Sequence, residues 1–194
     1  LNQSGAPADA GTALLGDRVQ LISMDIAEGL VTAEIVTQGP DEGMCCGTLK
    51  VRKTLALQDG LLAEIASEEL GTVALDDLMG TQWMLDRLNF DQPPLVDVMI
   101  SADFADGMVA GAGGCNQYSA AVTSEGGQLL TVGPIAATAM ACDEALEVRE
   151  ADYLAALQGA TGWRFFPGQL AVEYMTEGGE QGTLFFNPAD SADV

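Results

Sequence analysis

The sequence predicts an α+β protein that is mainly antiparallel β, with a small β-sheet module ahead of a larger curled sheet that carries one main helix. Short stretches of alternating apolar and polar residues recur along the chain, and turn-forming dipeptides separate them. One clear segment, which follows residue 143, has apolar residues at helical spacing. A chain of 194 residues, 48% of them hydrophobic, has enough apolar side chains for two folded modules.

The order of the modules follows from composition. Residues 1–16 are small and polar with Gly, Pro and Ser, which predicts a flexible leader. Residues 17–70 are expected to form the first β module, and residues 66–78 are polar or mixed, as in a connection. The second module is expected over residues 75–190.

Four strands are predicted in the first module. The stretches RVQLISMD and LVTAEIVTQ flank a break at Glu28-Gly29 and are expected to form a hairpin. A third strand is expected in CCGTLKVRKTLAL and a fourth in LLAEI. Asp59-Gly60 lies between them, and this dipeptide favours a hairpin turn because both residues tolerate positive φ.

The second module shows the same kind of pattern. GTQWMLDRL and VDVMISADF are predicted strands on either side of a loop that contains Pro93 and Pro94. Asp106-Gly107 is expected to turn the chain into MVAGAGG. QLLTV, WRFF, QLAVEYM and TLFF are the remaining strand candidates, separated by segments rich in Gly and Pro.

A helix is predicted between Asp143 and Gly159. Asp143 suits the N-cap position, and Glu144 and Glu147 suit the positive end of the helix dipole. Four apolar residues share one face at helical spacing and are expected to pack against the sheet: Leu146, Tyr153, Leu154 and Leu157.

The charge excludes some partners. Seven Lys+Arg against 29 Asp+Glu give a formal net charge of -22, which repels phosphate backbones and anionic lipid surfaces, so no nucleic-acid partner is expected. The simplest interpretation is a solvated acidic surface; the alternatives are a patch for a basic partner or for Ca²⁺. Asp103 and Asp106 do not complete a calcium-loop motif, so no metal ligand or cofactor is assigned.

The chain contains no histidine, which excludes Ser-His-Asp and Cys-His catalysis. Chemistry with two carboxylates, as in glycoside hydrolysis, remains open. The four cysteines are Cys45, Cys46, Cys115 and Cys142, without a C-x-x-C pair, and this pattern favours disulfides in an oxidising compartment over a zinc site. We favour the pairs Cys45–Cys46 and Cys115–Cys142, because each module then stabilises itself. Bridges between the modules are the alternative.

A long signature marks the second module. It contains the run Gly111 to Tyr118 (GAGGCNQY), then LLTVGP, Ile135, Thr138 and Met140-Ala141-Cys142. Gly80 and Trp83 precede it, and an acidic helix ending in Tyr153-Leu154-x-x-Leu157, then Trp163, follow it. In this order and spacing the module resembles META (HslJ-like) domains over roughly residues 75 to 187. The residues that carry the resemblance are Gly114, Cys115, Asn116, Tyr118, Thr138, Met140 and Cys142.

The resemblance implies an antiparallel sheet curled toward a barrel with a helix across it, in proteins of the bacterial envelope. It implies no established reaction, although the family is linked to heat-shock responses and antibiotic tolerance. The first module is similar, in the stretch QGPDEGMCC, to LppP/LprE-type lipoproteins, which also carry adjacent cysteines after an extended strand. It departs from their pattern at Gln38, Gly43 and Gly47.

Two residue groups have a functional alternative beside the structural one. Gly111 to Gly114 and Asn116 are expected to form a tight turn, in which the glycines supply positive φ and the Asn116 side chain satisfies backbone groups. A ligand cradle is the alternative. Strain in a ring between Cys45 and Cys46 would make it easier to reduce, so a redox switch is the alternative to a static ring.

These features predict a non-catalytic protein of the cell envelope, or a secreted one, that works as a protein-interaction, structural or stress-related module. The partner is an unidentified envelope protein or ligand. No apolar run approaches the roughly 20 residues that a membrane-spanning helix needs, and a lipid anchor upstream is compatible with the leader. The alternatives are a carboxylate-based glycan hydrolase and a small-molecule carrier.

Overall fold

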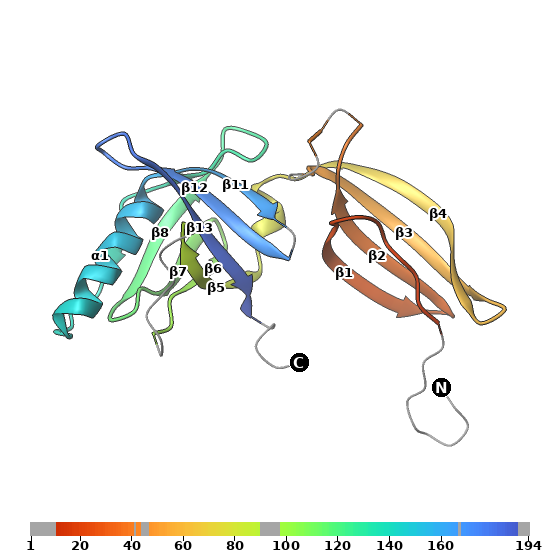
Figure 1. The fold of residues 1–194 in the computed structure, drawn as a ribbon, viewed down its shortest axis with the longest axis horizontal. Helices are drawn as coiled ribbons and strands as arrows, with labels where there is room; N and C mark the ends of the chain where they lie inside the picture. The colour runs from red at the N-terminus through yellow and green to blue at the C-terminus, as the bar shows by residue number, and fades with distance from the viewer. Residues whose placement is uncertain (1–10, 41, 44–46, 90–97, 167, 190–194) are drawn as a thin grey trace, which may run out of the picture. The chain divides into compact units, whose positions relative to one another are not determined.

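The chain folds into two compact units, Leu1–Thr72 and Val73–Val194. The break between them falls inside the stretch that the sequence predicts as a connection. The strand before the break, however, runs to Thr72, further than the LLAEI pattern indicates. The computed structural model describes residues 11–40, 42–43, 47–89, 98–166 and 168–189 (Figure 1).

The first unit is a four-stranded antiparallel sheet in which each strand pairs with the next along the chain. Both hairpin turns predicted from sequence are present. Glu28 and Gly29 have φ of 53° and 79°, and Asp59 and Gly60 have φ of 52° and 83°, as tight two-residue hairpins require. The strands are β1 (Gln20–Ala27), β2 (Leu30–Thr37), β3 (Leu49–Gln58) and β4 (Leu61–Thr72).

The core of the first unit lies on one face of this sheet. Ile35 pairs with Val51, and Val31 pairs with Leu55, so these apolar side chains share a face with Ala33. Residues 11–19 cross the sheet from the β3–β4 turn to the start of β1 (Figure 1). The two central strands, β2 and β3, are partly buried, and the outer strands, β1 and β4, are largely exposed.

The second unit is an antiparallel sheet that curls until its ends meet. The strand order is β10-β8-β7-β6-β5-β13-β12-β11, and β9 pairs with β8. Residues just before β9 close the ring onto β11, because the N–H of Leu130 donates to the carbonyl of Thr161 and the N–H of Trp163 donates to that of Gln128. The strands are β5 (Thr81–Leu88), β6 (Ser101–Ala105), β7 (Met108–Ala112), β8 (Gln117–Thr123), β9 (Thr131–Val132), β10 (Ala136–Ala137), β11 (Ala160–Phe166), β12 (Gln169–Met175) and β13 (Gln181–Pro188).

Large side chains fill the inside of this ring. Register places Phe186 between Leu85 on β5 and Leu170 on β12, and Leu170 pairs in turn with Phe165 on β11. These four side chains are buried, and so are Phe104, Val109, Val122, Trp163, Val172 and Leu184 on the same face. The fold predicted from the sequence, a mainly antiparallel α+β protein with a curled sheet and one main helix, is confirmed.

The helix α1 (Glu144–Gln158) has the predicted ends and packs against β9, β12 and β13. Asp143 is the N-cap residue, but its side chain makes no capping hydrogen bond. The buried face consists of Glu150, Tyr153, Ala156 and Leu157, whereas Leu146 and Leu154 are only half-buried. Within the described part of the chain, no helix combines the length and the apolar character that crossing a membrane requires.

A short 3-10 turn, η1 (Leu75–Leu78), precedes β5.

Some strand predictions need correction. The QLLTV segment contributes only the two residues of β9, because Leu129 and Leu130 serve the closure with β11 instead. The sequence patterns also do not single out β8 or the two-residue β10 as strands. Asp106-Gly107 does turn the chain between β6 and β7, with both φ values positive.

We predict that Phe186→Ala lowers the free energy of unfolding of the second unit by about 3–5 kcal/mol, because it opens a cavity in the filled ring. The measurement is urea denaturation followed by tryptophan fluorescence, since both tryptophans, Trp83 and Trp163, are buried in this unit. Val148→Ala, at an exposed position on α1, is the control and should change the free energy by no more than about 0.5 kcal/mol. A loss below about 1 kcal/mol for Phe186→Ala would contradict a tightly packed interior.

Candidate functional site

The signature residues of the second unit meet where α1 faces the turn between β7 and β8. Glu150 lies on the buried face of α1, and Asn116 lies in the turn directly before β8. The two side chains are 8% and 7% exposed. One carboxylate oxygen of Glu150 accepts the backbone N–H of Asn116 at 2.6 Å, and the other accepts the Asn116 side-chain amide at 2.7 Å. A single asparagine therefore supplies two donors to a buried carboxylate, which needs such partners away from water.

The opposite end of the Asn116 side chain holds the segment around β10. Its carbonyl oxygen accepts the hydroxyl of Thr138 at 2.9 Å and the backbone N–H of Met140 at 2.8 Å. The Thr138 hydroxyl accepts in turn the N–H of Gln117 at 3.2 Å. Asn116 thus connects three separate parts of the chain: the turn, the helix and the segment between β10 and α1.

A disulfide between Cys115 and Cys142 lies beside this network. The predicted pairing of these two cysteines is therefore present. The bridge closes a loop with a sequence separation of 27, which in the chain-entropy account stabilises the fold by about 3–4 kcal/mol. The same two segments are thus held together covalently by sulfur and noncovalently by Asn116.

Two tyrosines extend the network into the ring. The hydroxyl groups of Tyr118 and Tyr153 lie 2.7 Å apart, and the Tyr118 hydroxyl donates to the carbonyl of Ser101 at 2.7 Å. The Tyr153 ring, on α1, also packs edge-on against Phe186. Burial raises the pKa of both tyrosines well above the ordinary value, so both are neutral at physiological pH.

The glycines of the signature are needed mainly for close approach. A Cβ on Gly113 would lie 2.7 Å from a carboxylate oxygen of Glu150, and one on Gly111 would lie 2.2 Å from the carbonyl oxygen of Ser101. Of the three glycines in this turn, Gly111, Gly113 and Gly114, only Gly114 has a positive φ, at 115°. The positive φ expected of these glycines is therefore present at Gly114, whereas Gly111 and Gly113 are needed for close approach.

The arrangement leaves little chemistry to the signature. Each named polar side chain faces another group of the protein: Asn116 faces Glu150 and Thr138, and Tyr118 faces Tyr153. The backbone N–H of Asn116, which a ligand cradle would use, is occupied by Glu150. We therefore interpret this site as a structural lock and refer to Asn116, Thr138, Glu150, Tyr118 and Tyr153 as the polar lock.

Glu150 is the member of the lock that sequence reasoning missed. Its signal is a charge inside the apolar face of the helix, one turn before Tyr153 and two turns before Leu157. A carboxylate at such a position is buried and needs donors, which directs attention to the nearest signature residue with two N–H groups. Gly114, Cys115, Asn116, Tyr118, Thr138, Met140 and Cys142 all lie in or directly beside the lock.

The remaining candidate residues do not join it. Cys45 and Cys46 lie outside the described residues. Between β2 and β3, the carboxylate of Glu42 accepts the N–H groups of Gly39 at 2.7 Å and Thr48 at 2.9 Å. Burial raises the pKa of Glu42, but these hydrogen bonds outweigh it and the pKa lies below the ordinary value.

No group of three or more His, Cys, Asp or Glu side chains suited to a metal ion occurs among the described residues. The second unit has shallow surface depressions of about 260 to 280 Å³. Three of them contain one carboxylate each. Two of these share Glu173, on the outer face of β12, and the third contains Asp76, beside the loop after β8.

We predict that Asn116→Ala lowers the free energy of unfolding of the second unit by about 2–4 kcal/mol. The substitution removes one donor from the buried Glu150 carboxylate and both acceptor contacts to the β10 segment. Gln117→Ala, one residue along at an exposed position, is the matched control and should change it by no more than about 0.5 kcal/mol. Tryptophan fluorescence in urea measures both. Equal effects of the two substitutions would show that the lock contributes nothing.

The two buried tyrosines predict a loss of stability at alkaline pH. In the unfolded chain tyrosine loses its proton near pH 10, whereas the raised pKa in the folded chain keeps it protonated. The stabilisation is therefore complete below about pH 10 and falls above it, by about 1.4 kcal/mol per pH unit for each tyrosine. Tyr118→Phe should reduce this slope by about that amount, measured by urea denaturation from neutral pH upward. If Tyr118→Phe left the fall of the free energy of unfolding with pH unchanged, the raised pKa of Tyr118 in the folded chain would be contradicted.

Comparison with known proteins places the second unit in a family. The META domain profile matches residues 76–190, which is more than half of the chain. The NMR structure of a protein from Burkholderia xenovorans has 23% sequence identity and a TM-score of 0.47, and covers 66% of this chain and 97% of its own.

A second protein solved by NMR has 22% identity and a TM-score of 0.50, and covers 63% of this chain and all of its own. At that identity the likeness concerns the fold alone. No curated protein matches the chain. The resemblance of the first unit to LppP/LprE-type lipoproteins stays a prediction. The profile match agrees with the resemblance drawn from residues 75 to 187, and the chain belongs to the META domain family.

Proposed function

We propose that this protein is a non-catalytic binding module of the cell envelope, or a secreted one, that works through contacts of its outer surface with another protein. The observation that carries the proposal is the polar lock. Its hydrogen-bonding groups face one another and its backbone donor is occupied by Glu150, so the signature supports the shape of the domain. Specific function then belongs to the surfaces that this shape presents.

The filled interior supports the same conclusion. A small-molecule carrier of this shape would hold its ligand inside the curled sheet, in a cavity of several hundred Å³. Here Phe165, Leu170, Leu184 and Phe186 occupy that position and are at most 5% exposed. This packing weighs against the carrier alternative.

The distribution of carboxylates weighs against the glycan hydrolase. Hydrolysis of a glycosidic bond uses two carboxyl groups that face each other across a pocket, one of them with a raised pKa. The three depressions named above are each lined by one carboxylate, and Glu150 is occupied by Asn116. A surface-binding role needs no such pair.

The disulfide supports a location outside the reducing cytosol. Disulfides persist in secreted and envelope proteins and are rare in the cytosol, where thiols are kept reduced. Cys115–Cys142 connects the two segments that the lock also holds. A rigid domain presents its surface at a low entropic cost, which suits binding. The partner is an envelope protein, and a lipid anchor upstream would keep the chain near it.

The test uses the whole oxidised chain, immobilised and exposed to envelope extract at low, physiological and high salt. We expect the same protein to be retained in a fixed ratio to the immobilised chain, and the retention to be lost when the whole chain is unfolded in urea. In parallel, isolated envelope glycan is incubated with the chain in solution. Hydrolysis would release more than one soluble glycan fragment per protein molecule. Such release, if Glu173→Gln abolished it, would overturn the proposal in favour of hydrolysis.

A further inference from the structure

The two edge strands of the first unit differ in how they are protected. β4 carries Glu64, Glu68 and Glu69, and charged side chains on an edge strand hinder pairing with another chain. β1 carries a single charged residue, Asp25, and its residues from Leu21 to Ala27 are all exposed. β1 is therefore the unprotected edge of this sheet.

The apolar face of the sheet continues onto β1. Met24 pairs with Ala33, and Ile26 pairs with Val31, so both side chains share the face that contains the core. Met24 is 58% exposed and Ile26 is 71% exposed, whereas Ala33 is fully buried. One more strand beside β1 would cover these two side chains in the way that β2 and β3 cover one another.

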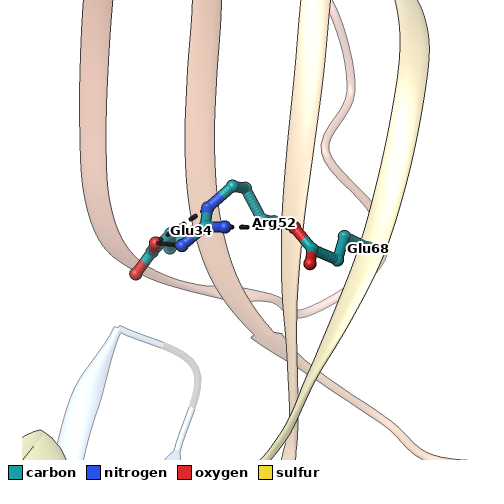
Figure 2. A network of polar contacts seen from close by, with 3 residues as sticks. All are labelled: Glu34, Arg52 and Glu68. Atoms are coloured by element: carbon teal, nitrogen blue, oxygen red, sulfur yellow. Dashed lines mark hydrogen bonds and ion pairs between the residues drawn. The ribbon is translucent and has the colours of Figure 1, made fainter.

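The opposite face of the sheet is acidic next to β1. Figure 2 shows a row across three strands in which Arg52 lies between Glu34 and Glu68, at 2.7 and 3.0 Å. The row ends toward β1 with Glu34, which pairs with Ser23. Asp25, on the same face as Ser23, makes no ion pair among the described residues. A cation on an added strand would meet Asp25 and continue the alternation of charge.

We propose that β1 binds an extended segment of a basic protein, which adds to the sheet as a fifth strand. Its apolar side chains lie over Met24 and Ile26, and its Lys or Arg side chains alternate with them and face Asp25. Backbone hydrogen bonds along the edge give affinity, and the alternation gives specificity. A bulge between Leu21 and Ser23 interrupts the register, so the pairing runs over Ser23 to Ala27. This inference rests on the proposed binding function and names its surface and partner.

A second copy of the chain fits this edge less well than a basic partner. Each copy carries a net charge of -22, so self-association brings together two strongly acidic proteins. A basic segment gains from that same charge. Self-pairing is nevertheless a distinct outcome of the experiment below.

The probe is a blocked peptide of ten residues in which valine and lysine alternate, and its binding to the whole chain is measured by calorimetry at low and physiological salt. Ile26→Lys and Leu61→Lys are a matched pair of variants: both add one positive charge at an exposed apolar position, one on β1 and one on β4. We expect Ile26→Lys to weaken binding by roughly tenfold or more, and Leu61→Lys by about twofold or less.

Four further measurements complete the test. Asp25→Asn should weaken binding of the lysine peptide but not that of a valine-threonine peptide, and the bound peptide should slow hydrogen exchange at alternate amides of β1. Absence of binding at millimolar peptide, or equal effects of the two lysine substitutions, would overturn the inference. A dimer in sedimentation that Ile26→Lys abolishes would overturn it in favour of self-pairing. If Ile26→Lys still retains the envelope partner, only this inference fails and the proposed function stands.

Discussion

The burial of one carboxylate constrains the whole second unit. Glu150 lies on the face of α1 that packs against the sheet, where an ionised group without donors would cost several kcal/mol. Asn116 supplies both donors, and it does so only if the turn before β8 reaches the helix. Gly113 is required at the closest point because any side chain there would meet the carboxylate. The position of the helix, the turn and the β10 segment therefore follows from satisfying a single charge.

The disulfide and the polar lock hold the same segments for different reasons. The bridge between Cys115 and Cys142 mainly restricts the unfolded chain, whereas the hydrogen bonds of Asn116 select one arrangement of the folded chain. The side chains of both are engaged with other groups of the protein. A signature made of Cys, Asn, Tyr and Thr suggests chemistry when it is read as a list of residue types, and its contacts show that it determines shape.

The sequence predicts those elements whose signals are local. The positions of the two helix termini, at Asp143 and Gly159, depend on the backbone preferences of adjacent residues. The same holds for the hairpin turns, at Glu28-Gly29, Asp59-Gly60 and Asp106-Gly107. Elements that depend on distant partners were missed. β10 has only two residues, and the segment that follows it is held by Asn116. Two register shifts between β3 and β4 disturb the alternation that would have predicted β4 through Thr72. Glu150 was missed because its donors are 34 positions away in the sequence.

The two units treat the edges of their sheets in opposite ways. The META unit brings its ends together through Leu130 and Trp163, and closure of a sheet removes the unpaired backbone groups that attract other chains. The first unit remains an open sheet with two edges, one of them acidic and the other apolar. A chain with 29 acidic residues could protect both edges at little cost. Instead, it places three glutamates on β4 and one aspartate on β1. This asymmetry is what a sheet needs when one edge must stay available for pairing with an added strand.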